Sequence, residues 1–180
     1  MNDWQHLDHT NGLIFPWYTE AFLHVLRTWN ISDWVVGEFG AGASTLWWRD
    51  KVKELISVDN NPDWAAKSGA ILAETEEEYL KALGDEACYD CIIIDGEWRN
   101  ACGPVAMKVI KRGGIVILDN SDRDDYSRIH NLFKYNERHS YPQQNHPEWR
   151  TCYWVVIKKT ECVFSHAEAA ADQRRRKCES

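Results

Sequence analysis

The chain has 180 residues, of which 44% are hydrophobic and 27% charged, a size and composition typical of one globular domain. Its net charge of −7 argues against nucleic acid as the main partner, because phosphate contacts require a basic surface. No stretch approaches the roughly 18 apolar residues of a membrane span, and residues 1–10 lack the hydrophobic segment of a signal peptide. We therefore expect a cytoplasmic protein with a small-molecule substrate, and its oligomeric state stays open.

The distribution of apolar residues predicts a single domain over residues 1–165. Helical spacing of apolar side chains from Thr19 onward predicts a helical cap within residues 11–30. The aromatic turn at 15–18 fits two interpretations, a lid over a ligand or packing of the helix onto a sheet. Residues 166–180 are alanine-rich and then charged, which predicts a flexible tail.

A glycine-rich turn follows the first apolar strand. Residues 33–50 read DWVVGEFGAGASTLWWRD. The apolar run predicts a buried strand, and Gly40 and Gly42 permit the unusual backbone angles or the close approach needed just after it. Ser44 or Thr45 can then begin a helix, whose first backbone N–H groups attract negative charge. The pattern predicts a ligand-binding loop.

Two residues of this loop discriminate between ligands. A dinucleotide-binding loop reads G-x-G-x-x-G, and Thr45 replaces its third glycine here, which disfavours an NAD-dependent oxidoreductase. Glu38 lies two residues before Gly40, where its carboxylate repels a pyrophosphate but attracts an ammonium group. A ligand with a positively charged amino acid end therefore fits the loop better.

Asp59 lies 19 residues beyond Gly40, at the end of the apolar strand predicted at 54–58. An acidic residue about 20 residues after the glycine loop accepts hydrogen bonds from ribose hydroxyls in βαβ nucleotide sites. The alternative role is a helix cap, since Asn60 and the residues after it also begin a helix well. We favour the ribose role because the loop and the spacing agree.

Two further apolar strands end in polar residues. Residues 89–94 lead to Asp95, and residues 115–118 lead to Asp119 and Asn120. Ligands of open α/β sheets bind outside the carboxyl ends of the strands, so the acidic strand ends are expected to converge on one rim. These strand ends are Glu38, Asp59, Asp95 and Asp119.

With these motifs the sequence resembles the class I S-adenosylmethionine-dependent methyltransferases. Their first motif places an acidic residue two positions before a G-x-G turn, as Glu38, Gly40 and Gly42 do here. The resemblance covers residues 35–158 and implies a three-layer α/β, Rossmann-like fold with a mostly parallel seven-stranded sheet. The strand at 152–158 is then the one antiparallel strand, and the alternation of apolar strands with helical stretches agrees with this fold.

The resemblance also implies S-adenosylmethionine as the cofactor, bound by the glycine loop and the strand ends. Ser44 stands where the family often has a third glycine. The residues that it assigns to the cofactor are Glu38, Gly40, Ala41, Gly42, Ser44, Thr45, Asp59, Asn60, Asp95 and Trp98.

The implied reaction is methyl transfer to a small-molecule acceptor, with oxygen favoured as the acceptor atom. Asp95, Asp119 and Asn120 are the candidate catalytic residues, because they resemble the strand ends that hold Mg²⁺ in catechol-type O-methyltransferases. That family has a lysine base where this sequence has Arg99, so Mg²⁺ is not favoured. The alternatives are Asp95 or Asp122 as a general base without metal, or these residues as helix caps.

Other function classes stay open or are disfavoured. The amino-methylating nucleic-acid enzymes of this superfamily have an Asn/Asp-Pro-Pro-aromatic motif after the fourth strand, where this sequence reads DGEW at residues 95–98. Methylation of nucleic-acid bases is thus disfavoured. A non-catalytic binding or regulatory protein that keeps the nucleotide-binding sheet is the main alternative, and an NAD-dependent oxidoreductase is less favoured.

Overall fold

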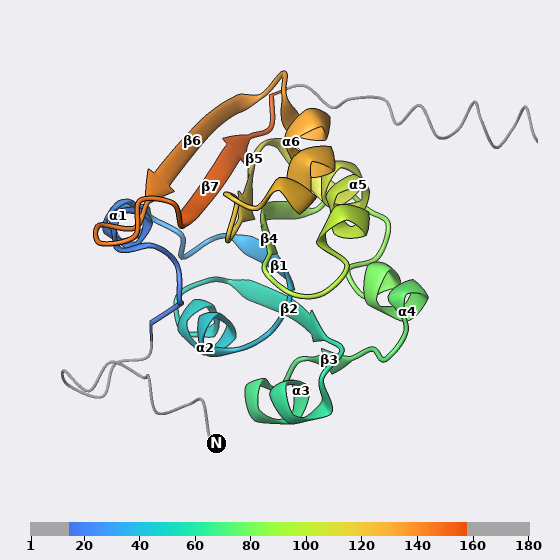
Figure 1. Ribbon diagram of the computed structural model, residues 1–180. Coiled ribbons are helices and arrows are strands. Elements are labelled where there is room, and N and C mark those ends of the chain that lie inside the picture. Colours follow the sequence, from blue (N-terminus) through green and yellow to red (C-terminus); the bar gives the residue numbers. More distant parts are fainter. Residues whose placement is uncertain (1–14, 158–180) are drawn as a thin grey trace, which may run out of the picture.

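The computed structural model describes residues 15–157, which form a three-layer α/β fold (Figure 1). The expectations for residues 1–14 and for the flexible tail at 166–180 lie outside the described residues. The strands are β1 (Val35–Phe39), β2 (Glu54–Asp59), β3 (Ile71–Leu72), β4 (Tyr89–Ile94), β5 (Ile110–Leu118), β6 (Glu137–Pro142) and β7 (Arg150–Val155). The helices are α1 (Glu20–Leu26), α2 (Ala43–Arg49), α3 (Pro62–Ser68), α4 (Glu76–Lys81), α5 (Arg99–Val109), α6 (Ser127–Phe133) and the 3-10 helix η2 (Asp124–Tyr126). None of these helices is long and apolar enough to cross a membrane.

The strands form one seven-stranded sheet in the order β3-β2-β1-β4-β5-β7-β6. The pairs from β3 through β5 are parallel, whereas β7 pairs antiparallel with both β5 and β6. The predicted mostly parallel sheet with one antiparallel strand is confirmed. Because β7 is reversed, its first residue, Arg150, lies at the edge of the sheet where β5 ends.

β4 runs through the middle of the sheet and is apolar on both faces. Ile92 and Ile94 belong to the core beneath α4, α5 and α6, while Cys91 and Ile93 belong to the core beneath α1 and α2. All four side chains are fully buried. A strand that is covered on both faces reads as a continuous apolar run, which is why the sequence pattern identifies it.

β5 begins at Ile110, five residues before the predicted start at Ile115. Gly113 adopts φ 84°, and the pairing with β4 shifts register between Tyr89 and Cys91. The chain therefore bulges there without leaving the sheet.

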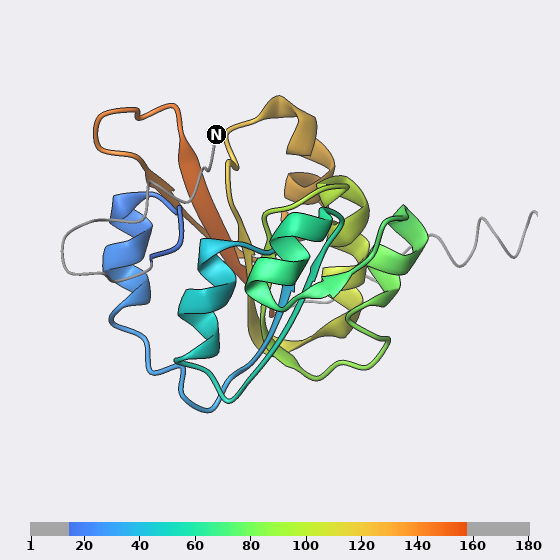
Figure 2. The ribbon, with the colours of Figure 1, turned by 90° about the horizontal axis from the view of Figure 1, so that it is seen from below.

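α1 lies against the β6 side of the sheet, beside the connection between β6 and β7 (Figure 2). The backbone N–H of Thr19, the residue before α1, donates to Thr151 Oγ1 (3.1 Å), and the Thr19 hydroxyl donates to the carbonyl of Tyr141 (3.1 Å). The next N–H, of Glu20, donates to Gln143 Oε1 (3.0 Å). The helix predicted from Thr19 onward is confirmed, and its first residues are fixed to β6 and β7.

Candidate active site

Three of the acidic strand ends lie at one level along the carboxyl edge of the sheet. The N–H of Asp95 donates to the carbonyl of Phe39 (2.8 Å), and the N–H of Asp119 donates to the carbonyl of Ile94 (3.3 Å). Asp59 is the last residue of β2, on the other side of β1. The expected convergence on one rim is confirmed for these three aspartates.

The loops after β1 and β4 touch through their glycines. Gly40 has φ 98°, and a Cβ atom added there would lie 2.3 Å from the backbone nitrogen of Gly96. A Cβ atom on Gly96 would lie 2.2 Å from Tyr79 Oη and 2.5 Å from the Cα atom of Gly40. Only glycine fits at either position, so these two residues fix the floor of the site.

A cavity of about 250 Å³ opens above this floor. Two carboxylates, Asp59 and Asp95, and two indole rings, Trp17 and Trp64, contribute to its wall. None of the described residues that line it is basic. The other lining residues are Gly40, Ala41, Gly42, Ala43, Ser44 and Gly96. The wall therefore combines negative charge with aromatic surface.

The structure brings six of the predicted cofactor residues together in this cavity. These are Gly40, Ala41, Gly42, Ser44, Asp59 and Asp95. Trp17 also lines it while 55% exposed. Phe15 and Tyr18 of the same turn pack with α1 over the sheet, so the packing interpretation is confirmed for them and the lid role stays a prediction. Sequence reasoning missed Trp64, whose only signal is an aromatic side chain in the first turn of the helix after Asp59.

Glu38 lies beneath the cavity, so the expectation of a carboxylate at the rim is wrong. Its side chain points to the same side of β1 as that of Val36, toward α2, and is fully buried. Its carboxylate accepts hydrogen bonds from the hydroxyls of Ser44 (2.5 Å), Thr45 (2.6 Å) and Ser57 (2.6 Å). Burial raises the pKa of Glu38, and these hydrogen bonds oppose that rise. Glu38 thus joins β1 to α2 and β2.

The backbone of the glycine loop also differs from expectation. α2 begins at Ala43 with Gly42 as its N-cap, so Thr45 lies inside the first turn. The N–H of Gly42 donates to Thr45 Oγ1 (2.9 Å), and the N–H of Ala41 donates to Asp59 Oδ2 (2.7 Å). Two N–H groups expected to be free for an anion are thus already bonded within the protein, which further disfavours a pyrophosphate ligand.

Asp59 braces the glycine loop. Besides the bond from Ala41, its Oδ1 atom accepts from the N–H of Asn61 (2.7 Å), and the residue is 7% exposed. The cap of α3 is Asn61, whose side chain accepts from the N–H groups of Asp63 (2.9 Å) and Trp64 (3.2 Å). The helix-cap alternative therefore belongs to Asn61, and the ribose role of Asp59 stays a prediction.

Arg99 joins the ends of β4 and β5. Its guanidinium donates to the backbone carbonyls of Asp95 (2.8 Å), Gly96 (3.0 Å) and Asp119 (2.7 Å). It also forms an ion pair with Asp95 Oδ1 (3.0 Å) and lies 5.2 Å from the ring centre of Tyr126. The Arg99 side chain is 9% exposed. The residue that departs from the catechol-type pattern is therefore part of the framework of the site.

Asp119 is 6% exposed and is held by a chain of hydrogen bonds that sequence reasoning missed. Its Oδ1 atom accepts from the Thr151 hydroxyl (2.5 Å), which in turn accepts from the N–H of Thr19 (3.1 Å). Burial raises the pKa of Asp119, opposed by Thr151 and Arg99. Burial and the nearby Asp119 raise the pKa of Asp95, opposed by Arg99. Both carboxyl groups therefore retain a proton to higher pH than an exposed aspartate.

Asp95, Asp119 and Asn120 do not fit a Mg²⁺ site. Asp95 Oδ1 is already paired with Arg99 (3.0 Å), and Asp119 Oδ1 accepts the Thr151 hydroxyl (2.5 Å), so each carboxylate has only one oxygen left for a metal ion. Asn120 has φ 46° and, like Asp119, lies outside the wall of the 250 Å³ cavity.

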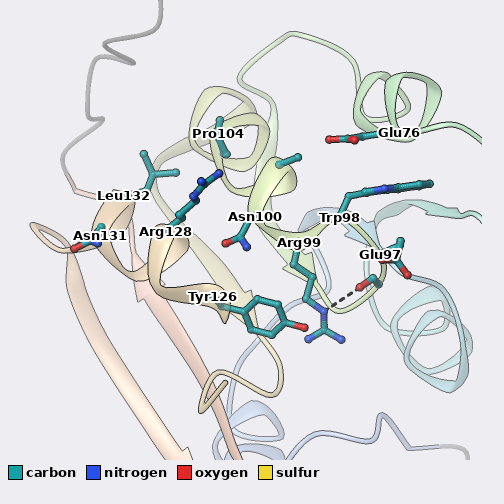
Figure 3. A pocket seen from close by; sticks show the side chains of 12 residues that line it. Glu76, Glu97, Trp98, Arg99, Asn100, Pro104, Tyr126, Arg128, Asn131 and Leu132 are labelled. Atoms are coloured by element: carbon teal, nitrogen blue, oxygen red, sulfur yellow. Dashed lines mark hydrogen bonds between the residues drawn. The ribbon is translucent and has the colours of Figure 1, made fainter. Parts of the chain in front are cut away.

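A larger cleft of about 1010 Å³ lies over the start of α5 and beside α6 (Figure 3). Trp98 and Glu76 lie on one side of it, with Tyr126 on the other. Trp98 precedes α5 with φ 46° and meets the ring of Tyr79 edge-on at 5.2 Å. The predicted cofactor residue Trp98 is thus in this cleft, which adjoins the smaller cavity because Gly96 lines both.

No family profile matches the sequence, and no curated protein matches it. Solved structures match the fold at low identity. A methyltransferase-like protein from Silicibacter pomeroyi is 16% identical, with a TM-score of 0.57, over 83% of this chain and 91% of that chain.

Two further solved structures are enzymes crystallised with cofactor or product. The N-methyltransferase NodS from Bradyrhizobium japonicum, in complex with S-adenosylhomocysteine, is 18% identical, with a TM-score of 0.50, over 70% of this chain and 80% of that chain. The O-methyltransferase TomG from Streptomyces achromogenes, in complex with S-adenosylmethionine, is 15% identical, with a TM-score of 0.50, over 76% of this chain and 78% of that chain. The chain therefore has the Rossmann-like fold of the class I S-adenosylmethionine-dependent methyltransferases.

Proposed function

We propose that this protein is an S-adenosylmethionine-dependent methyltransferase that acts on a small-molecule acceptor. The observation that carries the proposal is the 250 Å³ cavity, which places Asp59, Asp95, Trp17 and Trp64 around the glycine loop without a basic side chain among its described lining residues. This wall favours a cationic ligand. S-adenosylmethionine has two cationic groups, its sulfonium and its ammonium.

The cofactor's parts are assigned to the two adjoining cavities. The methionine end lies against the loop from Gly40 to Ser44, and Asp59 accepts hydrogen bonds from the ribose hydroxyls. The adenine ring extends past Gly96 toward Trp98 in the larger cleft, which offers an aromatic face. Glu38 supports the loop from beneath without touching the cofactor.

The proposed reaction needs no covalent intermediate. A lone pair on the acceptor atom attacks the sulfonium methyl group in line, the carbon–sulfur bond breaks, and the cofactor leaves as a neutral thioether. The protein accelerates this step by holding the two reactants at about 3 to 3.5 Å and by excluding water. Asp119 takes the proton that the acceptor loses, because its raised pKa suits a general base and Arg99 and Thr151 hold it at the rim.

The acceptor atom is proposed to be an oxygen. A neutral amine attacks through its lone pair without help, whereas a hydroxyl becomes a good nucleophile only as its proton is removed, so a buried carboxylate held by Thr151 has a defined task with an oxygen acceptor. The proposed role of Asp119 does not depend on a metal, so EDTA is expected to leave turnover unchanged.

Calorimetry and thermal shift with S-adenosylmethionine, S-adenosylhomocysteine and NAD test the proposal. Binding of the first two ligands without a response to NAD supports the proposal. A ligand at 100 times its Kd adds about 2.7 kcal/mol to the stability of the folded protein, which a thermal shift readily detects. Binding of NAD alone overturns the proposal. Production of S-adenosylhomocysteine with a panel of hydroxyl and amine acceptors then distinguishes an enzyme from a binding protein, which gives affinity without turnover.

A further inference from the structure

Trp17 lines the 250 Å³ cavity yet keeps 55% of its surface in contact with solvent. By contrast, Trp47 and Trp48 on α2 are 5% and 0% exposed, and Trp149, which is 53% exposed, lines neither cavity. Tryptophan side chains are highly buried on average, so an indole that is half exposed at the edge of a cavity leaves apolar surface available for contact with a ligand. This is the behaviour of a residue that completes its burial against a ligand.

The exposure of Trp17 does not come from a loose turn. The residues on both sides, Pro16 and Tyr18, are buried. Tyr18 Oη accepts a hydrogen bond from Trp48 Nε1 (3.3 Å), and the next residue, Thr19, is bonded to Thr151 on β7. The two residues that follow Trp17 are therefore tied to α2 and to β7, and they fix the turn that presents the indole at the cavity.

The chemistry of the wall divides between the two cationic groups of the proposed cofactor. An ammonium group carries N–H donors that the carboxylates of Asp59 or Asp95 can accept. A sulfonium group has no N–H or O–H donor, so such hydrogen bonds cannot hold it. The face of an aromatic ring can attract it, because the ring's negative quadrupole acts on any cation within about 6 Å.

Trp64, the other indole of the wall, is less suited to this role. Its ring lies against the glycine loop, 3.8 Å from the position that a Cβ atom on Gly42 would take. It therefore supports the loop on the side of α3, whereas Trp17 lines the same cavity with 55% of its surface exposed.

We infer that Trp17 recognises the charge of the cofactor by placing its indole against the sulfonium, and that this makes the site prefer S-adenosylmethionine over S-adenosylhomocysteine. The inference rests on the proposed function. When the methyl group leaves, sulfur becomes a neutral thioether and the attraction to the ring is lost. Trp17 is thus a specificity-determining residue, because the product formed by methyl transfer binds to it less tightly than the cofactor does.

The test compares Kd values for S-adenosylmethionine and S-adenosylhomocysteine by calorimetry in the wild type, Trp17→Phe and Trp17→Leu. Trp17→Leu is expected to weaken binding of the charged cofactor about 10-fold while changing that of the thioether less than about 2-fold, and Trp17→Phe to lie between. Trp149→Leu is the matched control, because Trp149 is 53% exposed and lies outside both cavities.

If Trp17→Leu weakens binding of both ligands equally, Trp17 contributes only apolar contact and the inference is wrong. Unchanged affinity for both ligands would also overturn it. A wild-type protein that binds neither ligand would instead refute the proposed function. Unchanged melting temperatures of the variants establish that the comparison concerns the site and not the fold.

Discussion

Arg99 and Asp119 belong to different βα units, yet Arg99 Nη1 donates a 2.7 Å hydrogen bond to the backbone carbonyl of Asp119. The same guanidinium bonds the carbonyl and the carboxylate of Asp95. One side chain therefore fixes the spacing of the two strand ends at which the proposed chemistry takes place.

Replacing Arg99 with lysine should lower the free energy of unfolding by about 2 to 4 kcal/mol, because an ammonium group cannot reach the carbonyls of both strands and leaves buried acceptors unpaired. Urea unfolding measures this loss. Arg128→Lys, an exposed position on the same cleft, should change stability by less than about 0.5 kcal/mol. Equal stability of Arg99→Lys and the wild type would contradict the bridging role.

Gly40→Ala should destabilise the protein by about 3 kcal/mol or more, since the new methyl group would meet the backbone of Gly96 at 2.3 Å and φ is 98°. Gly42→Ala is the matched control in the same loop. A Cβ atom there meets only the ring of Trp64, at 3.8 Å, so its stability should change by less than about 1 kcal/mol. Thermal unfolding separates the two, and similar losses in both would mean that the contact between the loops is not tight.

Glu38→Gln should remove a pH dependence of stability. The pKa of Glu38 is raised by burial, so the folded state binds a proton more tightly than the unfolded chain does. The stability from this group is fully present below the ordinary glutamate pKa of about 4.3 and is lost as pH rises through the raised folded value.

Urea unfolding between pH 4 and pH 8 should therefore show a decline in the wild type that is weaker in Glu38→Gln. The exposed Glu86→Gln serves as the control and should keep the wild-type decline. Parallel curves for the wild type and Glu38→Gln would place the pH dependence elsewhere.

Thr151→Val should shift the acidic limb of the turnover rate to higher pH. The Thr151 hydroxyl lowers the pKa of Asp119, so its loss should raise that pKa further, while Arg99, Asp95 and Asp122 stay in place around it. Thr151→Ser should restore the wild-type profile because it keeps the hydroxyl. A lower rate with an unmoved limb in Thr151→Val would mean that Thr151 only supports the fold.

Asp119→Asn should lower turnover about 100-fold or more while the Kd of S-adenosylmethionine changes by less than about 3-fold, because Asp119 is assigned to the acceptor side. Single-turnover kinetics and calorimetry give the two values. Equal losses in both would move Asp119 into the cofactor pocket.

The sheet and the glycine loop were predictable from the sequence because they depend on local patterns. The apolar run of β4 lies within one strand, and the glycines at 40 and 42 and the spacing to Asp59 lie within one βαβ unit. Glu38 was expected at the rim because it lies near the end of a strand. Side chains alternate along β1, however, and this alternation turns Glu38 toward α2, on the same side as Val36.

The contacts between residues of different strand–helix units could not be predicted from any short stretch of the sequence. Thr151 meets Asp119 across 32 residues, and only the pairing of β7 with β5 brings them together. Arg99 appeared in the sequence as the absence of an expected lysine, whereas its four hydrogen bonds depend on the relative positions of two strand ends. Such residues can be found only once the neighbours of each strand are known.

The reversed direction of β7 has a consequence for how this scaffold can diversify. Because β7 starts at the edge where β5 ends, the hairpin at 143–149 arrives beside the strand ends, while Thr151, just inside the strand, keeps its bond to Asp119. Loops tolerate insertions far better than strands do. A library that varies only the length and sequence of residues 144–148 is therefore expected to change the surface beside Asp119 without touching the residues that line the 250 Å³ cavity, and it would show whether this hairpin selects the proposed acceptor.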